Sequence, residues 1–580
     1  MFDTLKEYWS LQKTYMGPFR FKIILLGFLL VVNMLLQIIN PQIIRYYIDS
    51  VTTAVTPDVF TNAALLYIGI AIVQQAVFVV SVYVSQDVAW GSTNNLRADL
   101  FRHGINLDMS FHNEYRPGDL IERIDGDVTT LSNFLSQFTL LIISNTLIIG
   151  GILTVLYVED IYLGIAFSLF TGLSFLLIYK TRDISVSLWR KVREASMNLM
   201  GMLQETMDGT EDIKSLGASE FIIKKYHYLS RDIYEKQMRA SIKTSIFIMV
   251  IYGMEALSAT LVFGLGVPLY QSGILSLGTV VMINLYAGFL LGPIIRILRQ
   301  LQELQLASAS IRRIKEIFSK TSQIQDIGMI ELQDDPMNLE FEKLTFEYLE
   351  DNPVLHDVTF TLKKNRSLGL IGHTGSGKTT ISRLIFRLYE PQEGAIRING
   401  NELREYPLTA LRRKIAIVTQ DVQIFEATLR DNITFFDESI PDSLILDAIR
   451  DVGLYSWFES LEQGLETKLS GEHGLSAGES QLLALTRVFL KNPNLVILDE
   501  ASSRLDPATE GLIEKAIDKL LKNRTSIIIA HRLSTLDRTD DILLLENGKV
   551  REFGKRIELA QNVNSRYYKL LQTGLQEVLA

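Results

Sequence analysis

Six long apolar segments in the first half of the chain restrict its fold more than any other feature. Each is about as long as a helix needs to be to cross a bilayer, roughly 20 residues. Six helices of this kind are hard to fit into a soluble protein, and lipid accepts only backbones that satisfy their own hydrogen bonds. The sequence therefore predicts six membrane-spanning helices. The segments are Phe21–Ile44, Phe60–Val84, Leu131–Tyr157, Ile161–Tyr179, Ile246–Tyr270 and Leu275–Leu298.

Basic residues indicate how these helices are oriented. The short turns at residues 50–58, 159–160 and 271–274 contain no Lys or Arg. The connections between the second and third segments and between the fourth and fifth are long and rich in both. Because Lys and Arg are enriched on the cytoplasmic side, we expect the long connections and the N-terminus in the cytoplasm.

Both long connections look like helices that continue out of the membrane and are interrupted at their far ends. The interruptions lie at residues 109–120 and 207–214. The residues alone leave two interpretations open, a plain turn or a short tip that docks on a cytoplasmic domain.

Composition excludes several classes of protein. The chain has 580 residues, a net charge of −9 and no cysteine. The acidic balance does not favour a nucleic-acid partner. A chain without cysteine forms no disulfide and holds no metal through thiolates. We also find no secretory signal-peptide pattern at the first apolar segment.

The second half of the chain reads as a soluble enzyme, and its strongest motif is a phosphate-binding loop. Residues 367–371 predict a short buried strand before the loop, and residues 381–389 predict a helix after it. Glycines let backbone N–H groups surround phosphates, and a helix start adds the positive end of its dipole. We expect Lys378 to reach the outer phosphates of ATP and the Thr379 hydroxyl to hold Mg²⁺. The loop consists of Gly372, His373, Thr374, Gly375, Ser376, Gly377, Lys378, Thr379 and Thr380.

A second motif supplies two carboxylates at the end of an apolar strand. Residues 495–498 are apolar, and Asp499 and Glu500 follow them. We expect Asp499 to hold the Mg²⁺ shell and Glu500 to orient and polarise the attacking water. Together with the phosphate loop, this pair predicts ATP hydrolysis in an α/β P-loop NTPase domain.

Between these motifs, residues 475–481 read Leu-Ser-Ala-Gly-Glu-Ser-Gln and resemble the signature sequence of ATP-binding-cassette (ABC) transporters. Further residues match other motifs of this family, in the same order along the chain. With six spans ahead of them, the whole chain resembles a half-transporter of the type I exporter group. The matching residues are Tyr348, Gln420, Ser476, Gly478, Asp506 and His531.

The resemblance implies a role for each mark. Tyr348 would stack on adenine, Gln420 would contact Mg²⁺, and His531 would sense the γ-phosphate. Asp506 lies in the loop after the catalytic carboxylate. In this family two cassettes close head to tail, so that each ATP lies between the phosphate loop of one chain and the signature of the other. The two tips would be coupling helices that sit in grooves of the cassettes.

The signature departs from the usual Leu-Ser-Gly-Gly-Gln. Ala477 replaces a glycine and Glu479 replaces a glutamine. A methyl group at position 477 would crowd a backbone that approaches the γ-phosphate. Intact catalytic residues beside a weakened signature favour one subunit of a heterodimer, whose partner has the intact signature and lacks the catalytic carboxylate. A homodimer that tolerates alanine is the alternative.

Glu255 stands in the middle of the fifth apolar segment. Ionisable residues inside a membrane are costly and often mark a substrate or ion path. The residues leave two interpretations open, a carboxylate on the path of a cationic substrate or one neutralised between helices.

We therefore expect an all-α six-helix transmembrane domain followed by an α/β P-loop NTPase domain of the ABC type. The expected boundaries are residues 1–317 for the transmembrane domain, 318–337 for a linker and 338–575 for the nucleotide-binding domain. The expected function is export of a drug, lipid or peptide-like substrate, driven by ATP hydrolysis with Mg²⁺. We place the protein in the cell membrane with its ATPase domain in the cytoplasm. An ATP-gated channel or a regulatory half on the same scaffold is the alternative.

Overall fold

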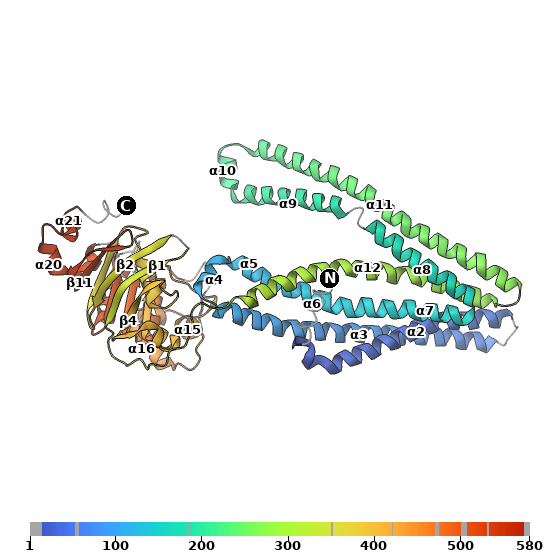
Figure 1. Cartoon of the computed structure of the whole chain (residues 1–580), viewed down its shortest axis with the longest axis horizontal. Coiled ribbons are helices and arrows are strands. Elements are labelled where there is room, and N and C mark those ends of the chain that lie inside the picture. Colours follow the sequence, from blue (N-terminus) through green and yellow to red (C-terminus); the bar gives the residue numbers. More distant parts are fainter. Residues whose placement is uncertain are drawn as a thin grey trace. The chain divides into compact units, whose positions relative to one another are not determined.

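The computed structural model describes residues 14–52, 57–182, 186–349, 352–419, 421–469, 475–499, 507–530 and 533–573. The chain forms two compact units, and Figure 1 colours it along its length. Residues 1–105 and 117–320 form the first, which we call the helical unit. Residues 106–116 and 321–580 form the second, which we call the sheet unit.

Six helices of the helical unit, within the described residues, are long and apolar enough to cross a membrane. They confirm the six predicted spans. Two π-helical turns, Glu122–Asp127 and Phe138–Ile143, interrupt the third span. The spans belong to α2 (Arg20–Thr52), α3 (Pro57–Asn106), α5 to α7 (Pro117–Ile121, Val128–Gln137 and Ser144–Glu159), α8 (Ile161–Arg182), α11 (Ser219–Gln271) and α12 (Leu277–Ser319).

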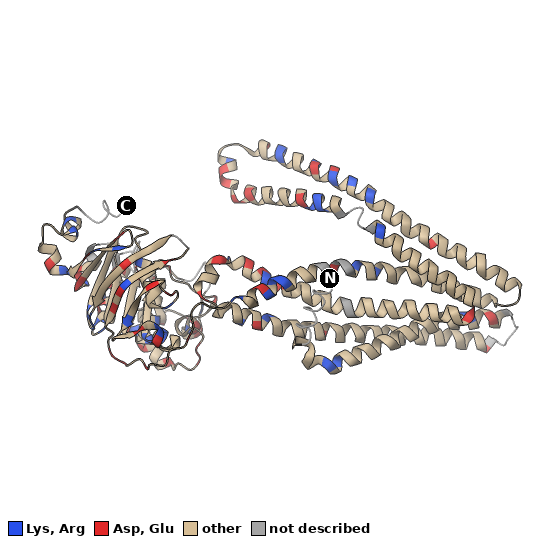
Figure 2. Cartoon of the chain, viewed as in Figure 1, with Lys and Arg blue, Asp and Glu red and all other residues tan. Residues whose placement is uncertain are grey.

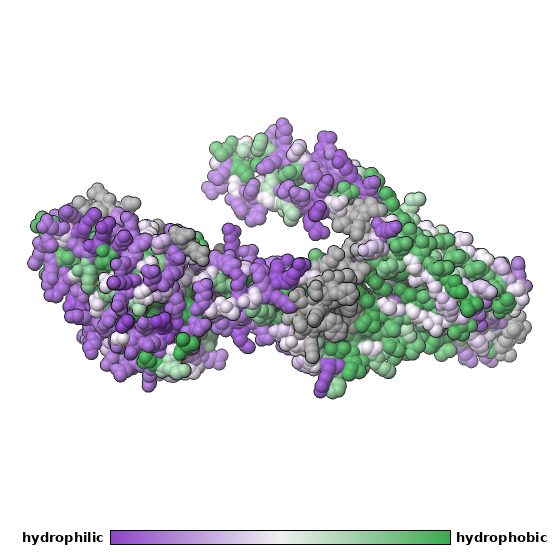
Figure 3. Space-filling view, in the orientation of Figure 1, coloured by the Kyte–Doolittle hydropathy of each residue, from purple (hydrophilic) through white to green (hydrophobic). Residues whose placement is uncertain are grey.

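Short helices lie at both predicted interruptions. They are α4 (Met109–Glu114) and α10 (Thr210–Ser215). Between α8 and α10, α9 (Val186–Asp208) packs along the first part of α11. Charged residues are frequent on α9, α10 and the start of α11, and rare on the long central parts of α2, α7 and α8 (Figure 2). Hydrophobic residues cover those central parts (Figure 3), as expected for surfaces in contact with lipid.

A buried carboxylate joins the first part of the third span to the part of α12 that follows the sixth span. Asp127 is only 2% exposed and accepts hydrogen bonds from Arg313 Nε at 2.7 Å and from Ser310 Oγ at 2.8 Å. A buried charge needs such partners because the surrounding protein replaces water poorly. This cluster therefore fixes the π-helical turn at Glu122–Asp127 against α12.

The sheet unit contains a four-stranded antiparallel sheet and a six-stranded, mainly parallel sheet. The antiparallel sheet has the order β2 (Pro353–Leu362), β1 (Leu339–Glu347), β4 (Glu393–Ile398), β5 (Asn401–Glu402). The second sheet has the order β12 (Lys549–Lys555), β11 (Asp541–Glu546), β3 (Ser367–Gly372), β10 (Thr525–Ile529), β9 (Leu495–Asp499), β6 (Ile415–Val418), with β12 antiparallel to the rest.

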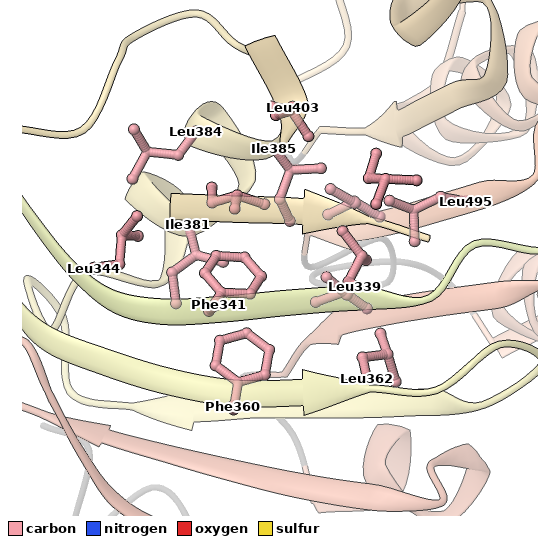
Figure 4. Packing of buried hydrophobic residues seen from close by; sticks show 14 of the residues in the cluster. Leu339, Phe341, Leu344, Phe360, Leu362, Ile381, Leu384, Ile385, Leu403 and Leu495 are labelled. Atoms are coloured by element: carbon pink, nitrogen blue, oxygen red, sulfur yellow. The ribbon is translucent and has the colours of Figure 1, made fainter. Parts of the chain in front are cut away.

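One hydrophobic core fills the space between the two sheets (Figure 4). The rings of Phe341 and Phe360 stack with their centroids 4.2 Å apart. Ile381, Leu384 and Ile385 add one face of α13 (Lys378–Ile385) to this core. The packing anchors the start of α13 and, with it, the phosphate loop that precedes the helix.

A second core covers the other face of the parallel strands. Two apolar faces are typical of strands that are buried between layers. The remaining α-helices and strands of the described residues are α14 (Leu408–Lys414), α15 (Leu429–Thr434), α16 (Asp442–Val452), α17 (Tyr455–Glu459), α18 (Ala477–Lys491), α19 (Pro507–Leu521), α20 (Arg556–Gln561), α21 (Arg566–Thr573), β7 (Ala427–Thr428) and β8 (Lys468–Leu469).

The helix after the phosphate loop is shorter than predicted. α13 ends at Ile385, and the backbone N–H of Phe386 caps it through the carbonyl groups of Ser382 and Leu384. Arg387 then adopts a left-handed conformation with φ of 47°. A non-glycine residue in this region ends the helical path. Tyr389 therefore leaves the axis of the helix, although the sequence pattern had placed it on that helix.

Candidate ATP-binding site

The predicted phosphate loop lies between β3 and α13. All six residues of β3 are buried, so the strand is fixed on both faces. Gly375 and Gly377 have φ of 81° and 103°. A Cβ atom on Gly377 would lie 2.5 Å from Leu355 Cδ2. These two positions require glycine because other residues adopt such φ values at a cost and the space at 377 is closed.

Lys378 is buried at the first position of α13. Its Nζ donates hydrogen bonds to the carbonyl oxygens of Gly372 at 2.7 Å and of His373 at 3.0 Å. The ammonium group therefore lies within the loop, where it adds positive charge to the helix start. A phosphate chain in the loop would contact both the Lys378 ammonium group and the positive end of the α13 dipole.

The loop also contains a polar atom suited to a phosphate. The Ser376 hydroxyl is buried and has no hydrogen-bond partner among the described residues. Buried polar groups are almost always hydrogen-bonded. Phosphate oxygens would satisfy this hydroxyl, so the loop fits the nucleotide that the sequence predicts.

The parallel register brings the predicted carboxylate to the same edge of the sheet. Ile529 of β10 pairs with Leu370 of β3 on one side and with Asp499 of β9 on the other. Chain segments that leave β3, β10 and β9 therefore emerge together. Asp499 ends β9 at this edge, while Thr379 is exposed in the first turn of α13. This donor set, one hydroxyl and one carboxylate, fits Mg²⁺ that is also held by ATP oxygens.

Tyr348 follows β1 and reaches the start of α13. Its hydroxyl lies 3.2 Å from Thr380 Oγ1, and Arg383 Nη1 donates to it at 3.2 Å. The sequence prediction included Tyr348 and Thr380 but missed Arg383. Arg383 lies three residues after Thr380, a spacing that places both side chains on one face of a helix, and this was the signal that could have indicated a side chain near the loop.

Tyr389 was also missed. Its ring contacts Tyr348 edge to face, with the centroids 5.1 Å apart. No local pattern predicts this contact, because it depends on the chain leaving α13 at Arg387.

The signature residues lie at the start of α18, whereas the phosphate loop precedes α13. The Ser476 hydroxyl accepts a hydrogen bond from Glu479 N, and Glu479 Oε2 accepts one from Ser476 N, which forms a reciprocal capping box. A Cβ atom on Gly478 would lie 2.3 Å from Thr509 Cγ2 on α19. Gly478 is therefore needed for the packing of α18 against α19. The Ala477 methyl group belongs to an exposed residue.

Four predicted site residues lie outside the described residues. They are Gln420, Glu500, Asp506 and His531. Among their neighbours, Asp499 and Ala530 are described, and Ala530 N donates to Leu370 O at 3.2 Å.

Comparison with known proteins decides the family. A model of the ABC transporter transmembrane region matches residues 23–294, and a model described as ABC transporter matches residues 355–503. An ATP-dependent lipid A-core flippase of Wigglesworthia glossinidia brevipalpis is 30% identical over 82% of this chain and 83% of its own. The chain belongs to the ABC transporter family.

Further comparisons agree. A Bacillus subtilis protein described as "Probable multidrug resistance ABC transporter ATP-binding/permease protein YheI" is 29% identical to this ABC exporter over 97% of the chain and 96% of its own. The solved structure of a bacterial Atm1-family ABC exporter with ATP bound has a TM-score of 0.75 and 21% identity. It covers 95% of this chain, and the match covers 98% of that structure, which confirms the type I exporter fold.

These findings confirm the prediction of ATP-driven transport by a membrane protein. The ABC exporter binds ATP and couples its hydrolysis to transport. It is a multi-pass membrane protein with a cytoplasmic ATPase domain. Exporters of this family work as dimers on substrates at the membrane.

Proposed function

We propose that this chain is one half of a heterodimeric exporter and that its two nucleotide elements serve unequal sites. The observation that carries the proposal is the contrast between the phosphate loop and the signature. Lys378 and Ser376 form a cradle that suits phosphate. Ala477, in contrast, adds a methyl group at an exposed position where the family has glycine.

The competent site would join this chain's phosphate loop to the intact signature of the partner. Lys378 binds the outer phosphates, and Tyr348 stacks on adenine. Thr379, Gln420 and Asp499 hold Mg²⁺, which bridges the phosphates and neutralises developing charge. The exposure of Thr379 and the position of Asp499 at the end of β9 support this part.

Hydrolysis would then depend on Glu500, which follows Asp499 in the sequence. A carboxylate there orients and polarises the attacking water. His531 comes two residues after the end of β10 in the sequence and would contact the γ-phosphate. Ser476 and Gly478, with the Asp506 loop, would face the partner's nucleotide.

The proposed boundaries keep the transmembrane domain at residues 1–317, the linker at 318–337 and the nucleotide-binding domain at 338–575. α4 and α10 would be its two coupling helices. That residues 106–116 pack within the sheet unit supports this role for α4.

We favour an amphipathic drug or lipid as the substrate, with a cationic group. The relatives named above concern lipid A-core and multidrug resistance. Glu255 lies in α11 within an apolar span and is exposed in the single chain. Tyr252, 67% exposed, stands one turn before it. A carboxylate beside an aromatic ring suits a cation.

The first experiment changes Glu500→Gln in the transporter reconstituted in lipid with its partner. ATP should become trapped while turnover falls by about 100-fold or more. Glu462→Gln, an exposed acid in the same unit, is the matched control and should keep normal turnover. Near-normal hydrolysis by the Glu500 variant would remove this residue from its proposed role.

Two further measurements test the rest. Purified alone, the chain should not form a homodimer with full substrate-stimulated ATPase activity, and finding one would refute the heterodimer. In inverted vesicles, the pair should accumulate substrate uphill. Passive equilibration without accumulation would favour the channel alternative.

A further inference from the structure

Three aromatic side chains meet beside the predicted adenine position, and we call them the aromatic corner. They are Phe346, Tyr348 and Tyr389. Tyr348 lies edge to face with Phe346 at 4.8 Å and with Tyr389 at 5.1 Å between centroids. The ring centroids of Phe346 and Tyr389 lie 5.6 Å apart. Edge-to-face pairs at these distances are attractive and orient the rings. The rings of Phe346 and Tyr389 therefore determine the plane of the Tyr348 ring.

Of the two rings that pack against Tyr348, Tyr389 is the one that also contacts α4. Its side chain is only 6% exposed, and burial raises the pKa of its hydroxyl above the ordinary value. Asn113 Nδ2 of α4 donates a hydrogen bond to this hydroxyl at 2.7 Å. The single amide therefore links α4 to the aromatic corner.

α4 itself is held firmly in the sheet unit. Asp108 caps the helix by accepting hydrogen bonds from Ser110 N at 3.1 Å and Phe111 N at 3.3 Å. The other oxygen of the same carboxylate accepts one from Gln323 N at 2.5 Å. Phe111 is buried. Asn113 consequently approaches Tyr389 from a fixed position.

The hydroxyl end of Tyr348 lies at the start of α13, next to the phosphate loop. Its hydroxyl contacts Thr380 Oγ1 at 3.2 Å, and the Arg383 guanidinium lies 5.9 Å from the centre of its ring. The ring is therefore set between the start of α13 and Tyr389. A change at either side would alter the surface on which a base can stack.

We propose that Tyr389 is a positioning residue for the adenine of ATP, which sets the plane of Tyr348 and ties that setting to α4 through Asn113. The inference rests on the proposed stacking role of Tyr348. It goes beyond it, because it assigns base recognition to a residue that does not touch the base and to an amide on α4.

The loss of Tyr389 should affect binding of the base more than the rate of hydrolysis. Stacking on an aromatic side chain contributes more for a large purine than for a pyrimidine, and loss of a platform costs about 1–3 kcal/mol per base. The side chain of Tyr389 contacts the rings of Phe346 and Tyr348 and the amide of Asn113, so its effect on ATP would pass through Tyr348. Its loss should therefore raise the KM for ATP and leave kcat nearly unchanged, while the preference for ATP over CTP falls.

The test uses the full transporter with its partner in lipid, and measures kcat and KM with Mg-ATP and with Mg-CTP. Tyr389→Leu removes the ring that packs against Tyr348 and should lower the ATP-to-CTP ratio of kcat/KM about 3- to 10-fold, as expected for one aromatic pair. Tyr406→Phe is the matched control. It removes a buried tyrosine hydroxyl bonded to Ile398 O at 2.9 Å in the same unit and should leave the ratio unchanged.

A double-mutant cycle tests the link to α4. Asn113→Ala and Tyr389→Phe each remove the same hydrogen bond and should each lower the ratio about 2- to 3-fold. The double variant should show no further loss, because neighbouring changes in one bond are not additive. Independent, additive effects would overturn the link, and the cycle keeps the test decisive if Tyr389→Leu fails to assemble.

Tyr348→Leu separates the two levels of the proposal. If it leaves the KM for ATP unchanged, the stacking role itself fails. If it raises that KM and lowers the ratio while Tyr389→Leu does neither, the stacking role holds and the positioning role is wrong.

Discussion

The Glu479 carboxylate accepts a hydrogen bond from Ser476 N at 2.7 Å, while the Ser476 hydroxyl accepts one from Glu479 N at 3.2 Å. The acidic residue of the signature is thus engaged with the start of its own helix. A negative charge at that end is favourable because of the helix dipole. Glutamate is therefore accommodated at this position within α18.

This arrangement predicts that Glu479→Gln has little effect, because glutamine also completes a capping box. Glu479→Ala should destabilise the start of α18 by about 0.5–1 kcal/mol. Thermal unfolding and ATPase assays of the assembled transporter measure both variants. A rise in ATPase activity above about tenfold for Glu479→Gln would contradict the prediction, because it would mean that the charge impairs the signature.

Gly377→Ala should disrupt the phosphate loop. The left-handed φ of 103° costs a residue with a Cβ atom about 1–2 kcal/mol, and that atom would meet Leu355 at 2.5 Å. We expect ATP affinity to fall at least about tenfold, measured by binding of a fluorescent ATP analogue. Gly400→Ala is the control, since its φ is 87° but nothing lies within 4 Å. It should affect stability alone, and a similar loss of affinity there would remove the loop from the explanation.

Asp127→Asn should weaken the helical unit. The carboxylate holds Arg313 and Ser310, and leaving a buried group with a poorer partner costs about 1–3 kcal/mol. A lower apparent Tm of the detergent-purified protein would show this. Asp125→Asn is the matched control because Asp125 is 68% exposed in its pair with Arg97. Exposed pairs contribute little, so equal losses at the two positions would refute the prediction.

Glu255→Gln should reduce transport of a lipophilic cation. Tetraphenylphosphonium uptake into inverted vesicles should fall about tenfold, since one desolvated charge contact contributes about 1.5–3 kcal/mol. Glu255→Asp should restore part of it. Glu220→Gln removes a charge from the start of the same helix and should change nothing. Unchanged uptake by the Glu255 variant, together with loss of subunit association, would assign this carboxylate to the dimer interface.

The six spans and the phosphate loop could be predicted because both depend on local patterns. An apolar run of about 20 residues needs no information about its neighbours. The loop from Gly372 to Thr380 carries its own glycines, and the flanking strand and helix are short-range features. The capping box was not predicted, although Ser476 and Glu479 have its three-residue spacing.

What could not be predicted depends on contacts between distant parts of the chain. Asn113 and Tyr389 are separated by 276 residues, and neither belongs to a local motif. The end of α13 was misplaced because residues 381–389 have helical character. The left-handed Arg387, 3% exposed and paired with Glu390, stops the helix through tertiary packing.

The inclusion of α4 in the sheet unit also bears on protein engineering. A graft that exchanged the ATPase between two such exporters at a cut near residue 338 would leave α4 behind in the recipient. Asp108 and Asn113 would then face a foreign linker and a foreign Tyr389 position. Chimaeras should therefore carry residues 106–116 along with the donor ATPase, as a two-segment transplant.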